Sequence, residues 1–317
     1  MLQCLLYTMN VGGQRQASGN AYVHRFQEAD MKQLTLKALG KINLGLDVTG
    51  IRPDGYHEVR MIMQTVNLYD SIVLQSRDTM DVTMECNLKF LPINEENLCI
   101  RAAKLMMEKY GIKHGFHISL TKRIPVAAGM AGGSTDAAAV IHGINRMEGL
   151  GITKKELMKE SVVLGADIPY CIMRGTALAE GIGEELTRLP ALPKIPVLIA
   201  KPPFPVSTKE VYTALDANEN IEHPDIDALI KDINARDVDS LCKHMGNVLE
   251  DVTIPLHPEI QTLKEMMLED GAIGAMMSGS GPTVFGIFED KETMMRCKER
   301  LRESGLTQIV YGTTMFG

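Results

Sequence analysis

The segment IPVAAGMAGGSTDAAAVI, residues 124–141, is the most informative stretch of this chain. A strand-like run ends at Lys122 and Arg123, and the segment then passes through a glycine-rich turn into an alanine-rich helix. Glycines let main-chain N–H groups approach an anion closely. The first turn of the helix adds unpaired donors and the positive end of the helix dipole. The segment therefore predicts a phosphate-binding loop.

Two common phosphate loops do not fit this segment. The Walker A loop needs a Gly-Lys pair before its hydroxyl residue, and none follows here. The dinucleotide loop needs G-x-G-x-x-G, whereas this segment contains G-x-x-G-G. A turn whose small residues serve only helix packing is the alternative for such a short pattern. The preceding proline, the Ser134–Thr135 hydroxyl pair and Asp136 favour phosphate binding over that alternative.

The segment resembles the phosphate loop of the GHMP kinases, which include galactokinase and the homoserine, mevalonate and phosphomevalonate kinases. Four positions match that loop: Pro125, Gly129, Ser134 and Thr135. Ala131 replaces a frequent glycine, and Thr135 replaces a serine but keeps the hydroxyl. Asp136 stands where many members have alanine. An acidic or amide residue there is typical of one branch, which phosphorylates 4-diphosphocytidyl-2-C-methyl-D-erythritol.

Composition places the chain among ordinary globular proteins. It has 317 residues, 45% hydrophobic and 23% charged, with a net charge of −7. This acidity argues against nucleic acid or an anionic membrane as a partner. The six cysteines form no C-x-x-C pair, which favours reduced thiols in a cytoplasmic protein over a zinc site or a disulfide framework. No apolar stretch approaches the roughly 20 residues that cross a bilayer.

The order of predicted elements indicates an α+β protein with two domains, because helices and antiparallel strands share each half. Residues 1–30 are predicted to be an N-terminal extension. Residues 31–190 would form the ATP-binding domain and residues 191–317 the C-terminal domain, with the boundary in the proline-rich stretch from Pro190 to Pro205. The resemblance implies a ribosomal-protein-like first domain and a ferredoxin-like second domain.

Hydrophobic periodicity predicts the individual elements. Residues 33–49 should form two short strands broken at Gly40, and residues 58–76 should form strands around a turn at Asn67–Ser71. The expected helices cover residues 98–110, 134–148, 154–164, 208–215, 225–234, 237–245, 258–269 and 291–303.

A second motif, KINLGLDVTGIRPDGYHEV (41–59), predicts a strand followed by a Pro-Asp-Gly turn. Taken alone, Lys41 would be a surface charge, and Tyr56 and His57 would be packing residues. The run is nonetheless very similar to the diphosphocytidyl-methylerythritol kinase branch, and nearly every fixed position is met. The resemblance implies that Tyr56 stacks on cytosine, His57 hydrogen-bonds its edge, and Asn43 positions the methylerythritol end.

A third motif, LGADIPYCI (164–172), contains the expected catalytic base. Asp167 could simply cap the helix that follows, but the resemblance places the family's catalytic aspartate there. A carboxylate near an alcohol can accept its proton during phosphoryl transfer. Lys41 beside it would keep that carboxylate ionised. A fourth motif, MMSGSGPTVFGIF (276–288), resembles the family's third motif, which packs against the phosphate loop.

The resemblance assigns the remaining site residues. ATP would be held by Asn97, Lys122, Pro125, Gly129, Ala131, Gly132, Gly133, Ser134 and Thr135. The cytidyl substrate would be held by Asn43, Tyr56, His57, Thr208 and Tyr212, the last closing the other side of the base. Lys41 and Asp167 would act in catalysis. The sequence does not identify the metal ligands.

The leading hypothesis is an ATP-dependent kinase that phosphorylates the 2-hydroxyl of 4-diphosphocytidyl-2-C-methyl-D-erythritol in isoprenoid precursor synthesis. Mg²⁺ should accompany ATP. The expected partner is this small molecule, with no nucleic acid and no membrane, for a cytoplasmic monomer or homodimer. One alternative is another GHMP kinase, such as a homoserine or mevalonate kinase, although those substrates have no base for Tyr56 to stack on. The other is a nucleotide-binding regulator without catalytic activity.

Overall fold

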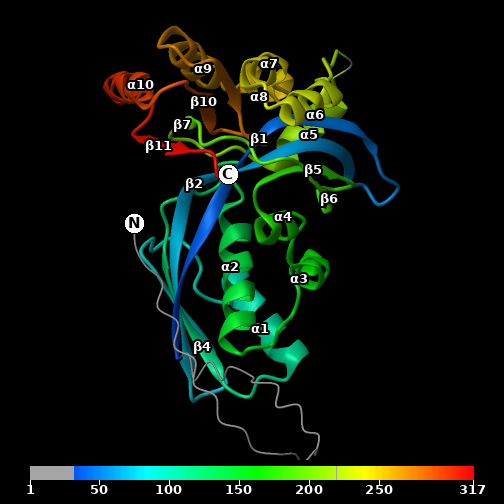
Figure 1. Ribbon diagram of the computed structural model, residues 1–317, viewed down its shortest axis with the longest axis vertical. Coiled ribbons are helices and arrows are strands. Elements are labelled where there is room, and N and C mark those ends of the chain that lie inside the picture. The colour runs from blue at the N-terminus through cyan, green and yellow to red at the C-terminus, as the bar shows by residue number, and fades with distance from the viewer. Residues whose placement is uncertain (1–31, 219) are drawn as a thin grey trace, which may run out of the picture. The chain divides into compact units, whose positions relative to one another are not determined.

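The computed structural model describes residues 32–218 and 220–317, and residues 31–317 form one compact unit. The predicted N-terminal extension, residues 1–30, lies outside the described residues. Within the described unit, helices and mainly antiparallel strands are mixed, so the predicted α+β class is confirmed (Figure 1). The predicted domain boundary at residue 190 stays a prediction.

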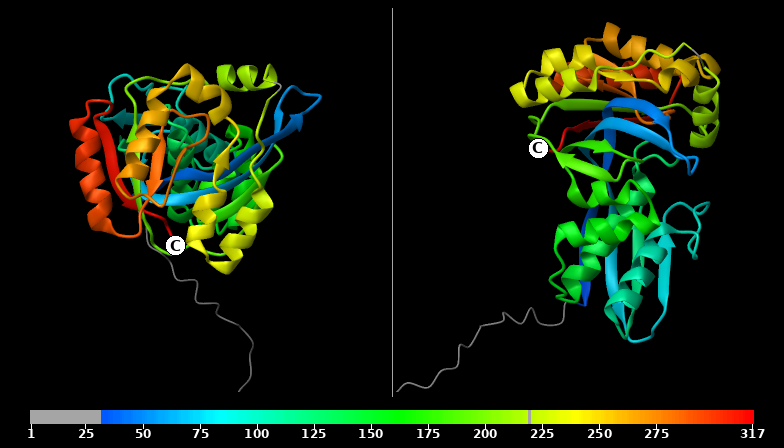
Figure 2. Two further views of the ribbon diagram at one scale, coloured as in Figure 1. Left: turned by 90° about the horizontal axis from the view of Figure 1, so that it is seen from above. Right: turned by 90° about the vertical axis from the view of Figure 1, so that its right-hand side faces the viewer.

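The first sheet is built on two long antiparallel strands, β1 (Gln33–Ile51) and β2 (His57–Arg77), which run through the molecule in Figure 2. Its central order is β3-β4-β2-β1-β8, and β5 and β6 extend from the other half of β2. The shorter strands are β3 (Val82–Cys86), β4 (Gly115–Thr121), β5 (Thr176–Glu180), β6 (Glu185–Arg188) and β8 (Gly246–Asn247).

Two predicted interruptions of these strands are wrong. Gly40 does not break β1, because the strand continues through it with a register shift between Leu39 and Lys41. The predicted turn at Asn67–Ser71 lies within β2, which continues through the register shift opposite Gly40. Its polar residues are typical of a turn in sequence, but in the fold they make hydrogen bonds. For example, Asn67 Nδ2 donates to Thr314 Oγ1 at 2.8 Å.

The helices of the first half lie against this sheet. α2 packs on β1 and β2, and α1 and α4 pack on α2 (Figure 1). Gly143 makes the close approach of α2 to β1 possible, because a Cβ there would lie 2.6 Å from Leu36 Cδ1. These helices are α1 (Leu98–Tyr110), α2 (Gly132–Met147), α3 (Lys154–Ser161) and α4 (Ile168–Met173), with a 3₁₀ turn at Val162–Leu164 between the last two.

The second half contains a four-stranded antiparallel sheet in the order β11-β7-β10-β9. One face is covered by α9 and α10, and the other packs toward β1 and β2 in a shared apolar cluster (Figure 2). The strands are β7 (Pro196–Lys201), β9 (Gly274–Met277), β10 (Val284–Ile287) and β11 (Ile309–Thr314). The helices are α5 (Thr208–Asp216), α6 (Ile226–Ala235), α7 (Val238–His244), α8 (Glu250–Leu256), α9 (Glu259–Glu269) and α10 (Lys291–Glu303).

The predicted helices are found close to their expected ends, but α4 and α8 were not predicted. Both are short, and α8 contains Pro255, which interrupts the helical hydrogen-bond pattern. Five cysteines of the described residues are free thiols, and four of them are buried. Among the described helices, none combines the length and apolar character that a bilayer crossing requires.

Candidate active site

The glycine-rich segment forms a loop that leads into the first turn of α2. Ala131 occupies the position before the helix with φ 54° and no side-chain cap, so the first N–H groups of α2 have no capping partner from that residue. A Cβ on Gly129 would lie 2.0 Å from Ser278 O, and its φ is 65°, so only glycine fits there. The loop thus presents main-chain donors and the positive end of a 16-residue helix to one space.

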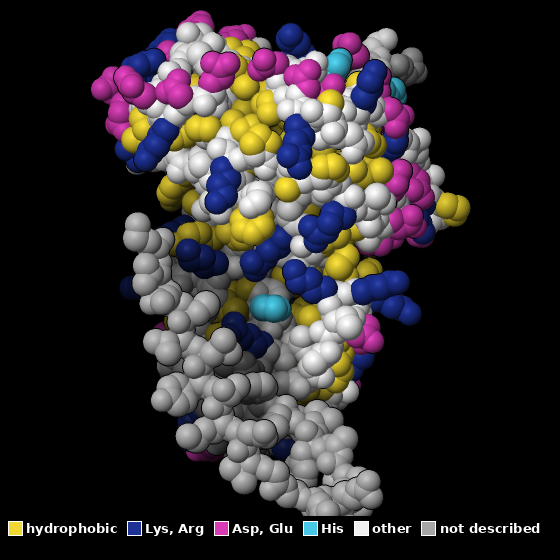
Figure 3. Space-filling view, viewed as in Figure 1, with side chains coloured by type: hydrophobic (Ala, Val, Ile, Leu, Met, Phe, Trp, Pro, Cys, Tyr) yellow, Lys and Arg dark blue, Asp and Glu magenta, His cyan; other side chains and the backbone are white. Residues whose placement is uncertain are grey.

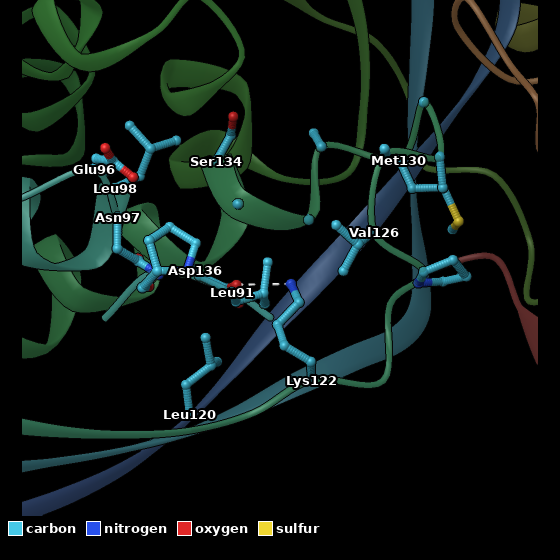
Figure 4. Close-up of a pocket in the computed structure, with 18 residues that line it drawn as sticks. Leu91, Glu96, Asn97, Leu98, Leu120, Lys122, Val126, Met130, Ser134 and Asp136 are labelled. Atoms are coloured by element: carbon cyan, nitrogen blue, oxygen red, sulfur yellow. Dashed lines mark hydrogen bonds and ion pairs between the residues drawn. The ribbon is translucent and has the colours of Figure 1, made fainter. Parts of the chain in front are cut away.

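That space is a cavity of about 400 Å³ between the loop and the start of α1 (Figure 4). Its lining includes the apolar side chains of Leu91, Leu98, Leu120 and Val126 together with the glycines of the loop and Ser134. Such a combination suits a nucleotide, with an adenine against the apolar wall and phosphates on the helix start. The structure brings all but one of the predicted ATP residues to this cavity: Asn97, Lys122, Pro125, Gly129, Ala131, Gly132, Gly133 and Ser134.

The exception is Thr135, which does not line the cavity. It is almost completely buried, and its hydroxyl donates to Leu39 O at 2.7 Å. Lys41 N donates to Met130 O in the same region. The Thr135 side chain therefore ties α2 to β1 and does not face a phosphate. Asn97 reaches the cavity but also caps α1, since its Oδ1 accepts a hydrogen bond from Cys99 N at 2.9 Å.

Lys122 lies just before the loop, in the wall of the first cavity, and is held by two buried carboxylates. Its Nζ donates to Asp70 Oδ2 at 2.5 Å and to Asp136 Oδ2 at 2.8 Å, the latter drawn in Figure 4. Asp70 Oδ1 also accepts from the backbone N–H groups of Arg123 and Ile124, which begin the loop. Burial raises the pKa of Asp136 well above its usual value, although Lys122 opposes that shift. The cluster neutralises Lys122 and fixes the start of the loop.

A second cavity of about 300 Å³ adjoins the first and contains the predicted catalytic pair. Lys41, Asn43 and Asp167 all line it. Lys41 Nζ donates to Asn43 Oδ1 at 2.7 Å, and no ion pair between Lys41 and Asp167 is present in the described part of the chain. Asp167 precedes α4 at its N-cap position, but its side chain makes no capping hydrogen bond. The capping role considered for Asp167 is therefore wrong, and the residue lines the cavity.

The fourth motif closes this cavity from the second half of the chain. Ser278 Oγ donates to Gly129 O at 3.1 Å, which joins the turn directly to the phosphate loop. Asn247 holds the same turn by donating to Met277 O and Gly279 O at 2.9 and 2.8 Å. The Thr208 and Ser280 hydroxyls lie 2.9 Å apart. The packing expected of this motif is therefore present.

A third cavity, of about 520 Å³, contains the residues predicted for the base. Tyr56, His57, Thr208 and Tyr212 line it. The His57 and Tyr212 rings have centroids 4.5 Å apart, and His57 Nε2 lies 2.7 Å from Asp216 Oδ1. Burial raises the pKa of Tyr212 to about 12, so its hydroxyl stays protonated at neutral pH. Tyr56 is 62% exposed and has an open aromatic face.

The three cavities follow one another. The first and second share Gly129, Ala131 and Ser134. The second and third share Val59, Ile182, Thr208 and Tyr212. A continuous path therefore leads from the glycine loop, past Lys41 and Asp167, to the aromatic cavity. Along this path a phosphate donor and a base-bearing acceptor could meet end to end.

Sequence reasoning missed several residues that build the site. Asp70 holds Lys122, and Asp216 holds His57. Asn247 holds the turn at residues 278–281. Asp136 was noted in the sequence, but its pairing with Lys122 was not predicted. The only sequence signal for Asp70 is an acidic residue in the run Asn67–Ser71, whose polar residues are typical of a turn.

Residues 97–175 match the family model "GHMP kinases N terminal domain", and residues 229–306 match "GHMP kinases C terminal". The 4-diphosphocytidyl-2-C-methyl-D-erythritol kinase of Lachnospira eligens is 55% identical over 90% of this chain and 99% of its own length. The enzyme of the same name from Lachnoclostridium phytofermentans is 52% identical, with 84% of this chain and 91% of its own length covered.

Solved structures show the same relationship. A crystal structure of 4-(cytidine 5'-diphospho)-2C-methyl-D-erythritol kinase matches with a TM-score of 0.77 and 31% identity, and the match covers 90% of this chain and all of that one. A homoserine kinase from Cytophaga hutchinsonii matches with a TM-score of 0.74 at 21% identity, over 91% and 96% of the two chains. The second match shows the shared fold alone.

Proposed function

This chain belongs to the family of 4-diphosphocytidyl-2-C-methyl-D-erythritol kinases, small-molecule kinases with the GHMP fold, and we propose that it phosphorylates the 2-hydroxyl of that substrate with ATP. The observation that carries the proposal is the row of three joined cavities. The first fits a nucleotide, the third fits a pyrimidine base, and the middle one places an acid and an amine between them.

Asp167 is the proposed general base. A sugar-alcohol hydroxyl is a poor nucleophile at neutral pH, and a carboxylate within hydrogen-bond reach accepts its proton as the phosphoryl group moves. Asp167 lines the middle cavity without a capping hydrogen bond that would occupy its oxygens. Proton transfer of this kind contributes about 10²–10⁴-fold to a rate.

Lys41 is proposed to stabilise the charge that develops on the acceptor oxygen. Its one hydrogen-bond partner among the described side chains is the neutral amide of Asn43, so its positive charge is not cancelled by a carboxylate. An ammonium group facing a developing alkoxide in a partly enclosed site lowers the barrier electrostatically. Asn43, completely buried, fixes the direction of the ammonium group.

The phosphates of ATP are proposed to lie on the first turn of α2, with Ser134 and the glycine N–H groups as donors. Mg²⁺ is proposed to accompany ATP, where it supplies neutralising charge at the β- and γ-phosphate oxygens. The described residues contain no cluster of three or more His, Cys, Asp or Glu side chains suited to a metal. Mg²⁺ keeps several waters and is held largely by substrate phosphates, and the Ser134 hydroxyl beside the loop would add one protein oxygen ligand.

The aromatic cavity supports a cytidyl group as the distal end of the substrate. Tyr56 is exposed and Tyr212 is half-buried, and a base stacked on an aromatic ring gains about 1–3 kcal/mol. His57 is oriented by Asp216 and can reach the edge of a base. The substrates of homoserine and mevalonate kinases have no base, so these aromatic residues argue against that alternative.

A coupled ADP-release assay tests the proposal. The full-length protein is supplied with ATP, Mg²⁺ and, in separate reactions, the diphosphocytidyl substrate, homoserine or mevalonate. ADP release only with the diphosphocytidyl substrate is expected. Equal release with homoserine or mevalonate would reject the substrate assignment. Nucleotide binding without transfer to any of the three would favour the non-catalytic regulator instead.

A further inference from the structure

A fourth cavity, of about 380 Å³, shares no lining residue with the three described above. It lies where the end of α4, the start of α3 and the end of β6 meet, and Phe316 closes one side. Three cationic side chains line it: Lys154, Arg174 and Arg188. In a protein with a net charge of −7, a cavity with three cations in its wall is unusual.

The cations of this cavity have no carboxylate partner in the described residues, whether from a side chain or from the chain terminus at Gly317, within the 4.0 Å that defines an ion pair. Their polar contacts are to main-chain oxygens. Arg174 Nη2 donates to Lys37 O at 3.0 Å, and Arg188 Nη2 donates to Met173 O at 2.9 Å. A guanidinium has five N–H donors, so most remain available on each arginine.

Arg174 also has a strained backbone. Its φ of 59° and ψ of 170° lie in a region that is nearly restricted to glycine and unfavourable for other residues. The following Gly175 has a φ of 90°, so the chain makes a sharp turn there with the arginine in the less suitable position. Strain of this kind is concentrated at ligand sites, where the surrounding structure holds an otherwise unfavourable side chain in place.

The electrostatic environment agrees with an excess of positive charge. Burial lowers the pKa of Arg174, because its guanidinium is partly removed from water without a counter-ion. Burial also lowers the pKa of His142 on α2, and the charges of Arg174, Lys154 and Arg146 lower it further. Figure 3 shows Lys and Arg side chains gathered on this face over α2, α3 and α4, while acidic side chains lie mainly toward its edges.

We propose that this cavity is a second anion-binding site, separate from the nucleotide site, for a small organic diphosphate. Arginine binds phosphate oxygens in a two-point geometry, and two arginines with a lysine match the charge of a diphosphate better than that of a single monoanion. The volume of about 380 Å³ leaves room for a small group beyond the two phosphates. A bound anion would neutralise the cations and compensate for the strain at Arg174.

Inorganic pyrophosphate is the probe, titrated by calorimetry into the full-length protein saturated with a non-hydrolysable ATP analogue that occupies the glycine loop. One pyrophosphate per chain is expected. Arg174→Gln and Arg188→Gln should each weaken binding at least about tenfold, because each removes a charge-assisted contact. Lys155→Gln is the matched control: Lys155 neighbours Lys154 on α3, but it does not line the cavity, so affinity should be unchanged.

Arg174→Gly separates binding from folding. Glycine accepts this backbone conformation without strain, so the variant should melt at or above the temperature of Arg174→Gln while losing pyrophosphate affinity. Three results would overturn the proposal. The first is no pyrophosphate binding, with the glycine loop occupied, at concentrations up to about ten times the millimolar phosphate level of a cell. The others are equal pyrophosphate affinity in the arginine variants, and pyrophosphate binding that disappears when the ATP analogue is present. Orthophosphate binding as tight as pyrophosphate binding would reject the diphosphate class.

Discussion

Two lysines near the phosphate loop have different surroundings. Lys122, in the wall of the nucleotide cavity, is almost completely buried between the carboxylates of Asp70 and Asp136. Lys41 lines the middle cavity and donates to the neutral amide of Asn43. The charge of Lys122 is cancelled within the protein, whereas that of Lys41 is not.

This difference separates a structural role from a chemical one. A buried ion cluster that also accepts hydrogen bonds from the loop backbone fixes the loop but has little charge left for a ligand. A lysine beside an amide and an open cavity keeps its charge for a reacting oxygen. Substitutions at the middle cavity should therefore reduce turnover, and substitutions in the buried ion cluster should mainly reduce stability.

The largest effect is expected for Asp167→Asn at the middle cavity. The amide cannot accept the proton of the alcohol, so kcat should fall by about 10²-fold or more. Nucleotide affinity and the midpoint of urea unfolding should stay close to wild type, since the Asp167 side chain caps no helix. Steady-state kinetics and nucleotide titration measure both. A variant that keeps more than about a tenth of kcat is incompatible with Asp167 as the base.

A loss of stability is expected for Lys122→Met, in the buried cluster with Asp70 and Asp136. Removing the cation leaves two buried carboxylates without it, and breaking such a pair costs about 3–5 kcal/mol of unfolding free energy. Urea denaturation measures the loss. Lys41→Met is the control, because it leaves no carboxylate unpaired, and it should lower kcat with little change in stability.

A double variant sharpens this test. Asp136→Asn added to Lys122→Met removes one of the two stranded carboxylates and should recover part of the lost stability. If Lys122→Met and Lys41→Met were equally stable, the proposed division between the two lysines would be wrong.

A smaller effect is expected at the aromatic cavity. Tyr56→Ala removes a stacking surface that is 62% exposed, so the fold should be unaffected. Loss of one stacked base should raise KM for the cytidyl substrate by roughly 5- to 150-fold, which corresponds to about 1–3 kcal/mol, and leave KM for ATP unchanged. Tyr311→Ala, at an exposed tyrosine of β11, is the control and should change neither constant. Equal changes in both KM values would contradict a role at the base.

The smallest effect concerns pH and the Asp136 carboxyl. Burial raises the pKa of Asp136 above its unfolded value, so its protonated form favours the folded state. That contribution is complete below the ordinary carboxyl pKa of 3.8 and is lost as pH rises through the raised value. The amide side chain of Asp136→Asn stays neutral at every pH. The unfolding free energy of the variant should therefore increase relative to that of the wild type as pH rises. Urea titrations at several pH values measure this, and a constant difference would mean that folding does not shift the pKa of Asp136.

The phosphate loop was predictable because its signal is local. Glycine spacing, the preceding proline and the start of α2 lie within residues 124–141, and the structure places almost all of them around one cavity. The buried ion cluster of Lys122, Asp70 and Asp136 was not predictable in the same way. Asp70 lies 52 residues before Lys122 in sequence, and only the pairing of β2 with β4 brings the two together.

The same argument explains the two errors in the strands. A polar run such as Asn67–Ser71 is typical of a turn when its partners are unknown. In the fold, Asp70 meets Lys122 and Asn67 meets the C-terminal segment, so the polar groups are satisfied within a long strand. Gly40 marks a register shift, which the sequence alone does not distinguish from a strand end.

The central claim is that Asp167 contacts the acceptor hydroxyl while the phosphate loop holds the phosphate donor of the same reaction. A crystal structure of the wild-type protein with a non-hydrolysable ATP analogue and the diphosphocytidyl substrate tests it most directly. The account predicts the substrate's 2-hydroxyl within about 2.6–3.2 Å of the Asp167 carboxylate, with the terminal phosphate of the analogue at the start of α2. A hydroxyl held by another base, with Asp167 turned away from both ligands, would contradict it.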